Sequence, residues 1–275
     1  MEISVRNIVF AIIIIVCVFA IGFGIYGQFF SDKPVENTIN VNTDNEDKLL
    51  EQNFKNIFKN SLDYQGYNVN TMGITKIDST QDLIYTWVER KQFVDNRYDL
   101  NLYIPRINIS NNTSVERFNE RIKSLFIDKA NDIIINATNN TIYTVEYMAY
   151  VNTNILSLVI KSTLKEGNNP QRVIIQTYNY NLSTNEEITL NQILDIKGLQ
   201  AKTVEDTILQ KVALANQEAE NLQRLGYNVY IRDLTSNIYK LENTDNYILG
   251  QNGKLYVIYP YGNANYTDAM DVIVF

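Results

Sequence analysis

The chain has 275 residues, a net charge of −7 at pH 7 and no histidine. Without histidine, neither Ser-His-Asp nor Cys-His nucleophile systems can be built, and zinc sites lose their imidazole ligands. No cluster of basic residues offsets the repulsion from a phosphate backbone, and no glycine-rich nucleotide-binding motif occurs. We therefore expect no nucleic acid partner, no metal site and no cofactor.

Residues Ile8 to Gly27 form a run of twenty residues without a charged side chain, and thirteen of them are Ile, Val or Phe. A helix of this length spans about 30 Å, which is the thickness of the hydrocarbon core of a bilayer. The run therefore predicts a transmembrane anchor. A cleavable signal peptide is the alternative interpretation, but the sequence after the run lacks an Ala-x-Ala pattern.

The predicted anchor separates a short tail from a long exported part. Residues 1–7 are expected in the cytoplasm, because a short N-terminal tail before a long C-terminal domain normally stays inside. Residues 31–46 are polar and predict a flexible stalk. We expect a single-pass protein of the cell membrane whose domain lies outside the cytoplasm. The only cysteine, Cys17, lies in the anchor, so packing rather than a disulfide must stabilise the exported part.

Residues 47–138 are expected to form the first part of the exported module. Apolar residues at helical spacing predict an amphipathic helix from Asp47 to Leu62 that packs onto the domain, with the bilayer surface as the alternative. Leu83 to Val88 and Phe93 to Ile104 are predicted to be strands, and Pro105 is expected to end the second.

A longer helix is predicted at the end of this part. Thr113 and Glu116 form a capping-box pattern, and the helix is expected to continue to about Ile135. Its apolar face is expected to comprise Phe118, Ile122, Leu125, Phe126 and Ile133.

Residues 139–275 predict a meander, a second long helix and closing strands. The meander comprises Thr141 to Val151, Ile155 to Lys165 and Arg172 to Leu182, with short polar connections that indicate antiparallel hairpins. A helix is predicted from Gly198 to about Gly226. The closing strands are Tyr247 to Leu249, Lys254 to Tyr259 and Asp271 to Phe275, with a turn at 251–253. This order predicts an α+β fold in which antiparallel sheets pack with two long helices.

Three stretches resemble an extracytoplasmic module that is shared by the anti-sigma factor RsiV and the peptidoglycan deacetylase PdaC. The strand-proline-helix unit from Tyr98 to Asn119 is similar to the N-terminal half of that module. Residues 178–194, YNYNLSTNEEITLNQIL, resemble its signature DLxTGxxITLxDLF, with Asn185 in place of the signature glycine. Residues 256–261, YVIYPY, and the ending 271–275 resemble its closing strands.

The resemblance implies a sensor or accessory domain that binds a lysozyme-like protein or peptidoglycan. Only seven residues precede the predicted anchor, so we do not expect a cytoplasmic sigma-binding domain. A metal-dependent deacetylase domain is not expected either, because it would need histidines. Asn185 can adopt the left-handed conformation that the signature glycine suggests.

The candidate binding residues are four tyrosines near the end of the chain: Tyr256, Tyr259, Tyr261 and Tyr266. A tyrosine ring offers apolar area to a sugar or a protein surface, and its hydroxyl forms hydrogen bonds. The competing interpretation is that these rings fill the core and form a turn around Pro260. We expect non-catalytic recognition of a protein or cell-wall ligand.

Two other functions remain open from the sequence. A glycoside hydrolase needs only two carboxylates, and the candidates are Glu186, Glu187, Asp268 and Asp271. A scaffold protein of the cell envelope could use the anchor and the helix from Asp47 to Leu62 as assembly surfaces. We expect no catalytic residues and place recognition before both alternatives.

Overall fold

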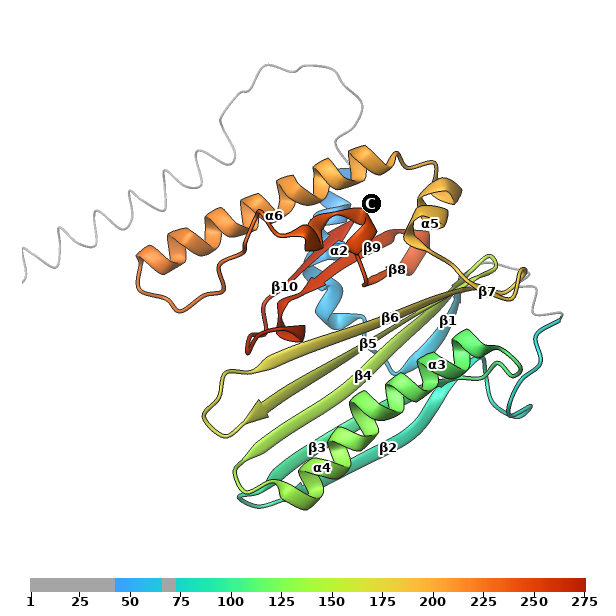
Figure 1. Cartoon of the computed structure of the whole chain (residues 1–275), viewed down its shortest axis with the longest axis horizontal. Coiled ribbons are helices and arrows are strands. Elements are labelled where there is room, and N and C mark those ends of the chain that lie inside the picture. Colours follow the sequence, from blue (N-terminus) through green and yellow to red (C-terminus); the bar gives the residue numbers. More distant parts are fainter. Residues whose placement is uncertain (1–42, 66–72) are drawn as a thin grey trace, which may run out of the picture. The chain divides into compact units, whose positions relative to one another are not determined.

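The predicted meander forms the centre of a seven-stranded sheet. The computed structural model describes residues 43–65 and 73–275. The sheet order is β2-β3-β4-β5-β6-β7, and β1 also pairs with β4 (Figure 1). The strands are β1 Ser61–Gln65, β2 Ile84–Val94, β3 Tyr98–Ile107, β4 Thr141–Asn152, β5 Ile155–Glu166, β6 Arg172–Asn181 and β7 Glu186–Glu187. The α+β class and the antiparallel β4-β5-β6 meander are confirmed.

The sheet is mixed, which corrects the prediction of purely antiparallel pairing. One edge of β4 is shared by two parallel neighbours: β3 pairs with residues 141–145, and β1 pairs with residues 148–152. Asn60 fills the position between them, because its backbone N–H donates to the Tyr147 carbonyl at 2.9 Å and its side chain accepts from the Tyr147 N–H at 3.0 Å. Two strands distant in sequence can therefore pair with the same edge.

The hairpin of β2 and β3 also differs from the prediction. β2 runs without interruption to Val94, and the chain turns at residues 95–97, where Asn96 has a positive φ of 58°. Pro105 does not end β3, which continues to Ile107. Pro105 lies opposite Thr86 beside a β-bulge, and proline is tolerated in a sheet at such irregular positions. From Tyr98 to Ile104, buried residues of β3 alternate with more exposed ones, as expected for a strand with one face in the core.

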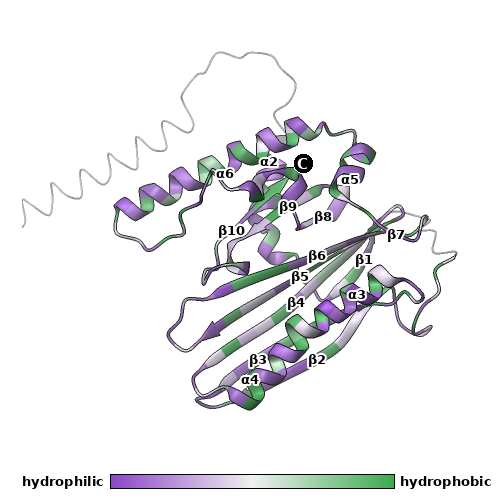
Figure 2. Ribbon diagram, in the orientation of Figure 1, coloured by the Kyte–Doolittle hydropathy of each residue, from purple (hydrophilic) through white to green (hydrophobic). Residues whose placement is uncertain are grey.

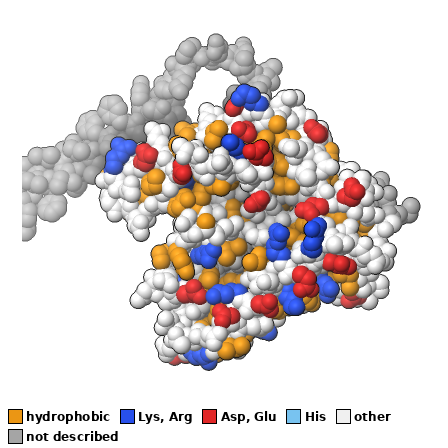
Figure 3. All heavy atoms as spheres, viewed as in Figure 1, with side chains coloured by type: hydrophobic (Ala, Val, Ile, Leu, Met, Phe, Trp, Pro, Cys, Tyr) orange, Lys and Arg blue, Asp and Glu red, His pale blue; other side chains and the backbone are white. Residues whose placement is uncertain are grey.

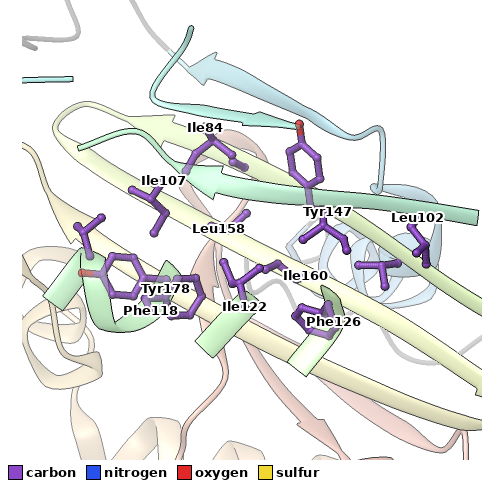
Figure 4. Packing of buried hydrophobic residues seen from close by; sticks show 14 of the residues in the cluster. Ile84, Leu102, Ile107, Phe118, Ile122, Phe126, Tyr147, Leu158, Ile160 and Tyr178 are labelled. Carbon is purple, nitrogen blue, oxygen red and sulfur yellow. The ribbon is translucent and has the colours of Figure 1, made fainter. Parts of the chain in front are cut away.

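One helical segment covers one face of this sheet. It comprises α3 Thr113–Ile122, a π-helical stretch Lys123–Asp128 and α4 Lys129–Asn136. Phe118, Ile122 and Phe126 are buried against the sheet (Figure 4), whereas Leu125 is 39% exposed and does not belong to the apolar face. The π-helical stretch shifts the rotation of side chains around the axis, which explains why regular helical spacing misplaced Leu125.

The second sheet is small and packs with the C-terminal helices. It has the order β10-β9-β8, with β8 Tyr247–Leu249, β9 Leu255–Pro260 and β10 Met270–Val274. The helices are α5 Leu190–Lys197, which the sequence analysis missed, and α6 Ala201–Arg224. Hydrophobic and hydrophilic residues are interspersed along α6 (Figure 2). Short 3-10 helices span Asn237–Tyr239, Leu241–Asn243, Gln251–Gly253 and Tyr261–Asn263.

Three buried clusters define the layers of the domain. The first lies between the α3–α4 segment and the large sheet, and the second lies between the small sheet and helices α5 and α6. The third joins the two sheets and includes Met148, Val159, Tyr256 and Ile258. Phe54 belongs to this third cluster, so the N-terminal helical segment packs onto the domain.

The N-terminal helix is shorter than predicted. α2 spans Thr43–Asn53 and is followed by a 3-10 turn at Phe54–Asn56, and the chain then enters β1 at Ser61. Leu62 is therefore a strand residue rather than the end of a helix. The division expected at residues 138 and 139 falls in the connection between α4 and β4.

The predicted membrane segment lies outside the described residues. Ile8 to Gly27, residues 1–7 and the stalk up to residue 42 belong to this undescribed part. Within residues 43–65 and 73–275, no helix combines the length and the apolar character needed to cross a bilayer.

Candidate binding groove

A polar pocket of about 580 Å³ opens beside β6. Helix α3 contributes Ser114, Arg117, Phe118 and Arg121, and the segment that enters β8 contributes residues 244–247. Its remaining lining residues are Gln176, Thr177 and Tyr178 of β6, Glu187 of β7 and Asn263. Basic and acidic side chains gather over α3 and the neighbouring strands in Figure 3. This pocket is the first half of the candidate groove.

The start of α3 is fixed by Asn112 rather than by the predicted capping box. The Asn112 side chain accepts hydrogen bonds from the N–H groups of Ser114 and Val115, at 3.1 and 3.2 Å. Its amide also donates to the Tyr180 hydroxyl at 2.9 Å and to the Asn185 carbonyl at 3.0 Å. The cap therefore ties the first turn of α3 to β6 and to the turn before β7. Asn185 has a φ of 58°, so it adopts the left-handed conformation that an asparagine tolerates.

A chain of hydroxyl groups connects three elements of the pocket wall. The Tyr178 hydroxyl donates to the Ser114 Oγ at 2.9 Å, and Ser114 in turn donates to the Glu187 carboxylate. The Tyr178 ring packs against Phe118 at a centroid distance of 4.5 Å (Figure 4). Burial raises the pKa of the Tyr178 phenol well above its usual value, so this hydroxyl stays protonated and acts as a donor.

The segment that enters β8 is held against β6 by side-chain hydrogen bonds. The Thr177 hydroxyl donates to the Asp245 carbonyl at 3.3 Å and accepts from the Tyr247 N–H at 3.2 Å. The Asn179 amide donates to the Tyr247 carbonyl at 2.7 Å. Burial raises the pKa of Tyr247 to about 12, and its hydroxyl donates to the Ile188 carbonyl at 3.2 Å. These contacts fix the backbone of this wall and leave the Asp245 carboxylate exposed.

A second pocket of about 320 Å³ adjoins the first, because Asp245, Asn246 and Asn263 line both. Its walls include Tyr230, Tyr259 and Tyr261. We call the two pockets together the groove: the polar pocket is its first half and the tyrosine pocket its second half.

The rings of the tyrosine pocket are fixed by stacking and hydrogen bonds. Tyr230 stacks on Tyr261 at 4.5 Å, and the Tyr239 and Tyr261 hydroxyls lie 2.9 Å apart. Burial raises the pKa of Tyr259 to about 12, and its hydroxyl lies 3.0 Å from the Thr244 hydroxyl. The rings that line this half of the groove are therefore held in place by the fold, and Tyr230 is the most exposed of the three that line it.

The structure separates the four tyrosines that the sequence analysis grouped. Tyr259 and Tyr261 line the groove, although each is 95% or more buried. Tyr256 points to the other side of β9, where it contacts Phe54 in the cluster between the sheets. Tyr266 is 60% exposed and lies near the Arg172 guanidinium, 5.8 Å from ring centroid to guanidinium carbon. Tyr256 and Tyr259 are three positions apart in one strand, and the two-residue period of a strand already places them on opposite faces.

The four candidate carboxylates do not line one pocket either. Glu187 lines the polar half of the groove, whereas Asp271 lines a separate pocket beside α6. Asp271 forms an ion pair with Arg232, and its carboxylate also accepts from the Tyr261 hydroxyl. Glu186 and Asp268 are exposed. No group of three metal-ligating side chains occurs among residues 43–65 and 73–275.

The sequence analysis missed Arg117, Arg121 and Asp245 as groove residues. One signal was available for the arginines: with Ser114 and Phe118 they follow three- and four-residue spacing, which puts all four on one side of α3. No signal was available for Asp245, because its approach to α3 depends on how two distant parts of the chain pack.

Comparisons with known proteins find likeness only at the level of structure. No family model matches the chain, and no curated protein matches it. A DUF3298 family protein from Pseudomonas aeruginosa is 14% identical, with a TM-score of 0.39 over 66% of this chain and 83% of that one. A DUF3298 family member from Bacteroides fragilis is 12% identical, with a TM-score of 0.33 over 65% of this chain and 80% of that one.

Proposed function

We propose that the chain is a membrane-anchored module that recognises a protein or cell-wall ligand outside the cytoplasm, without catalysing a reaction on it. The groove carries this proposal. Its walls come from α3, β6, β7 and residues 230–265, and they hold polar side chains that form no hydrogen bond or ion pair within the described residues, beside tyrosine rings. Binding pockets commonly combine apolar walls with a few fixed polar groups, and volumes of 300 to 1,000 Å³ are typical.

The arrangement around Ser114 favours recognition over catalysis. Its hydroxyl donates to the Glu187 carboxylate and accepts from the Tyr178 hydroxyl, and the chain has no histidine that could act as its general base. Among the four candidate acids, only Glu187 lines the groove. A hydrolase that uses two of these carboxylates would need both beside the same bond.

The class of ligand rests on the resemblance to the RsiV and PdaC module, which implies a lysozyme-like protein or peptidoglycan. The location rests on the apolar run from Ile8 to Gly27. Protease added to intact protoplasts should therefore remove residues 47–275. If these residues resist protease while known surface proteins are digested, the proposed location is wrong.

The groove is tested with a variant that fills it. Gln176 lies on β6 in the polar pocket, so Gln176→Trp should obstruct the groove. Gln210→Trp, on the exposed side of α6, is the matched control. Binding of the full-length chain in detergent micelles is measured with soluble peptidoglycan fragments and with lysozyme. We expect one of these ligands to bind, with an affinity that falls at least roughly tenfold in Gln176→Trp only. Equal affinities in the two variants would place recognition elsewhere.

A scaffold function is the second candidate, and one observation favours it. Several large apolar side chains on α6 and the loop after it are exposed: Leu209, Leu214, Leu222, Leu225 and Tyr227. Exposed apolar patches commonly mark interaction sites, and Leu222 and Tyr227 lie close together because the Tyr227 N–H donates to the Leu222 carbonyl at 3.1 Å. Self-association that is lost in Leu222→Asp but retained in Gln176→Trp would favour this candidate.

A further inference from the structure

Charges of opposite sign line the polar half of the groove without neutralising one another. Arg117 and Arg121 lie one turn apart on α3, and Asp245 lies on the segment that enters β8. Within residues 43–65 and 73–275, none of these three side chains forms an ion pair or a side-chain hydrogen bond. A pocket that holds unpaired cations and an unpaired carboxylate suits a ligand that carries both charges.

Two acids close to the arginines in the pocket or on α3 form contacts with other residues instead. Glu187 accepts the hydrogen bond of Ser114, and Glu120 pairs with Lys123 at 3.8 Å. The two guanidinium groups therefore remain available to a ligand. Guanidinium groups bind carboxylates with paired, charge-assisted hydrogen bonds, which are stronger than hydrogen bonds between neutral groups.

The Asp245 carboxylate is similarly available. The Asp245 backbone is anchored by Thr177 and its neighbour Tyr247 is anchored by Asn179, but the carboxylate itself is exposed at the junction of the two pockets. It would repel a purely anionic ligand and attract an ammonium group. Its position also places a bound ammonium beside the tyrosine pocket.

We infer that the groove binds a zwitterionic ligand of the short-peptide class, with its carboxylate at Arg117 and Arg121 and its ammonium group at Asp245. This inference rests on the proposed function, because it names the ligand class of the same groove. The polar pocket of about 580 Å³ has room for a short peptide. A side chain of the ligand next to the ammonium group would enter the adjoining pocket, where Tyr230 is the most exposed of the three lining tyrosines.

The test removes charges from the ligand and from the protein in turn. The probes are alanyl-alanine, its N-acetyl derivative, which lacks the ammonium group, and its C-terminal amide, which lacks the carboxylate. Each is titrated into the full-length chain in detergent micelles, and the dissociation constant is measured by calorimetry or nuclear magnetic resonance. The variants are the double change Arg117→Gln with Arg121→Gln, and the single change Asp245→Asn. Arg224→Gln and Asp195→Asn, at exposed helix positions outside the groove, are the matched controls.

The expected pattern pairs each ligand charge with one protein site. In the wild type and both controls, losing either ligand charge weakens binding roughly tenfold. In the arginine double variant, the C-terminal amide binds as well as the free peptide. In Asp245→Asn, the N-acetyl derivative binds as well as the free peptide. The unfolding midpoint of each variant shows whether the fold is retained.

Two results would overturn the inference about the zwitterionic ligand. The proposed function is decided by a separate measurement, the binding of Gln176→Trp. Binding of the three probes with equal affinity, or no binding of the free peptide in the millimolar range, removes the zwitterionic ligand class. If Gln176→Trp still binds peptidoglycan fragments or lysozyme more weakly than the wild type does, recognition in the groove is supported without the zwitterionic ligand class. If it does not, both proposals fail.

Discussion

Arg232 and Asp271 form a bidentate ion pair in which both nitrogen–oxygen distances are 2.6 Å and each side chain is only 11% exposed. Arg232 belongs to the loop after α6 and Asp271 to β10, so the pair fixes this loop to the small sheet. The Asp271 carboxylate also accepts the Tyr261 hydroxyl at 2.5 Å. The ion pair thereby holds one of the aromatic walls of the groove.

Replacing Asp271 with Asn should destabilise the domain by about 3–5 kcal/mol, because the Arg232 charge would stay buried without its partner. The free energy of unfolding is measured by urea titration. The control is Asp206→Asn, which breaks the exposed pair of Lys202 and Asp206 and should change the free energy by less than about 1 kcal/mol. Similar small effects of both changes would show that the buried pair does not stabilise the fold.

Replacing Asn112 with Ala should cost about 1–2 kcal/mol, because the first turn of α3 loses its cap. The neighbouring change Thr113→Ala should be nearly neutral, although the sequence pattern assigned the capping role to Thr113. Thermal unfolding of the two variants distinguishes the residues. A larger effect of Thr113→Ala would contradict the structure of this helix start.

Replacing Gly262 with Ala should destabilise the domain by about 1–3 kcal/mol or more. A Cβ atom at this position would collide with the backbone of Val173 and lie 2.6 Å from the Thr267 carbonyl oxygen. The exposed neighbour Asn263 provides the control, since Asn263→Ala should shift the free energy of unfolding by no more than about 0.5 kcal/mol. A Gly262→Ala protein as stable as wild type would rule out this close backbone approach.

The domain should lose stability in alkaline solution through its buried tyrosines. Burial raises the pKa of Tyr247, Tyr256 and Tyr259 to about 12, whereas an unfolded tyrosine titrates near about 10. Below about pH 10 the folded and the unfolded protein both keep these phenol protons, so the stabilisation by the buried tyrosines is fully present there. Between about pH 10 and 12 the unfolded state releases protons that the folded state retains, and stability falls.

Urea midpoints measured across this alkaline range, together with phenolate absorbance, test the effect. Tyr256→Phe removes one of these buried phenols, so its urea midpoint should fall less steeply with pH than that of the wild type. An equally steep fall in both proteins would assign the alkaline loss to other groups.

The fold was predictable from sequence where neighbouring residues determine the structure. The two-residue alternation in β3 and the polar turns of the meander predicted strands and pairing, because these signals are local. β1 could not be predicted in this way. It has only five residues, and its partners in β4 lie more than eighty residues further along the chain. Asn60, just before β1, hydrogen-bonds to Tyr147 and so fixes where this pairing begins.

The groove was predictable only in part for the same reason. The tyrosine-rich ending pointed to Tyr259 and Tyr261, which do line the groove. The spacing of Arg117 and Arg121 showed that they share a helix face, but not what that face lies beside. Their proximity to Asp245 depends on the packing of β8 against β6, which no local pattern encodes.

The central claim is that a ligand binds in the groove, and amide hydrogen exchange tests it most directly. Exchange in the full-length chain is compared with and without soluble peptidoglycan fragments, and with and without lysozyme. The account predicts that one of these ligands slows exchange in α3, Thr113–Ile122, and in residues 244–247, while exchange in the last turns of α6 is unchanged. The account would be contradicted if exchange in both groove segments stayed unchanged with peptidoglycan fragments and also with lysozyme, each at the highest concentration tested.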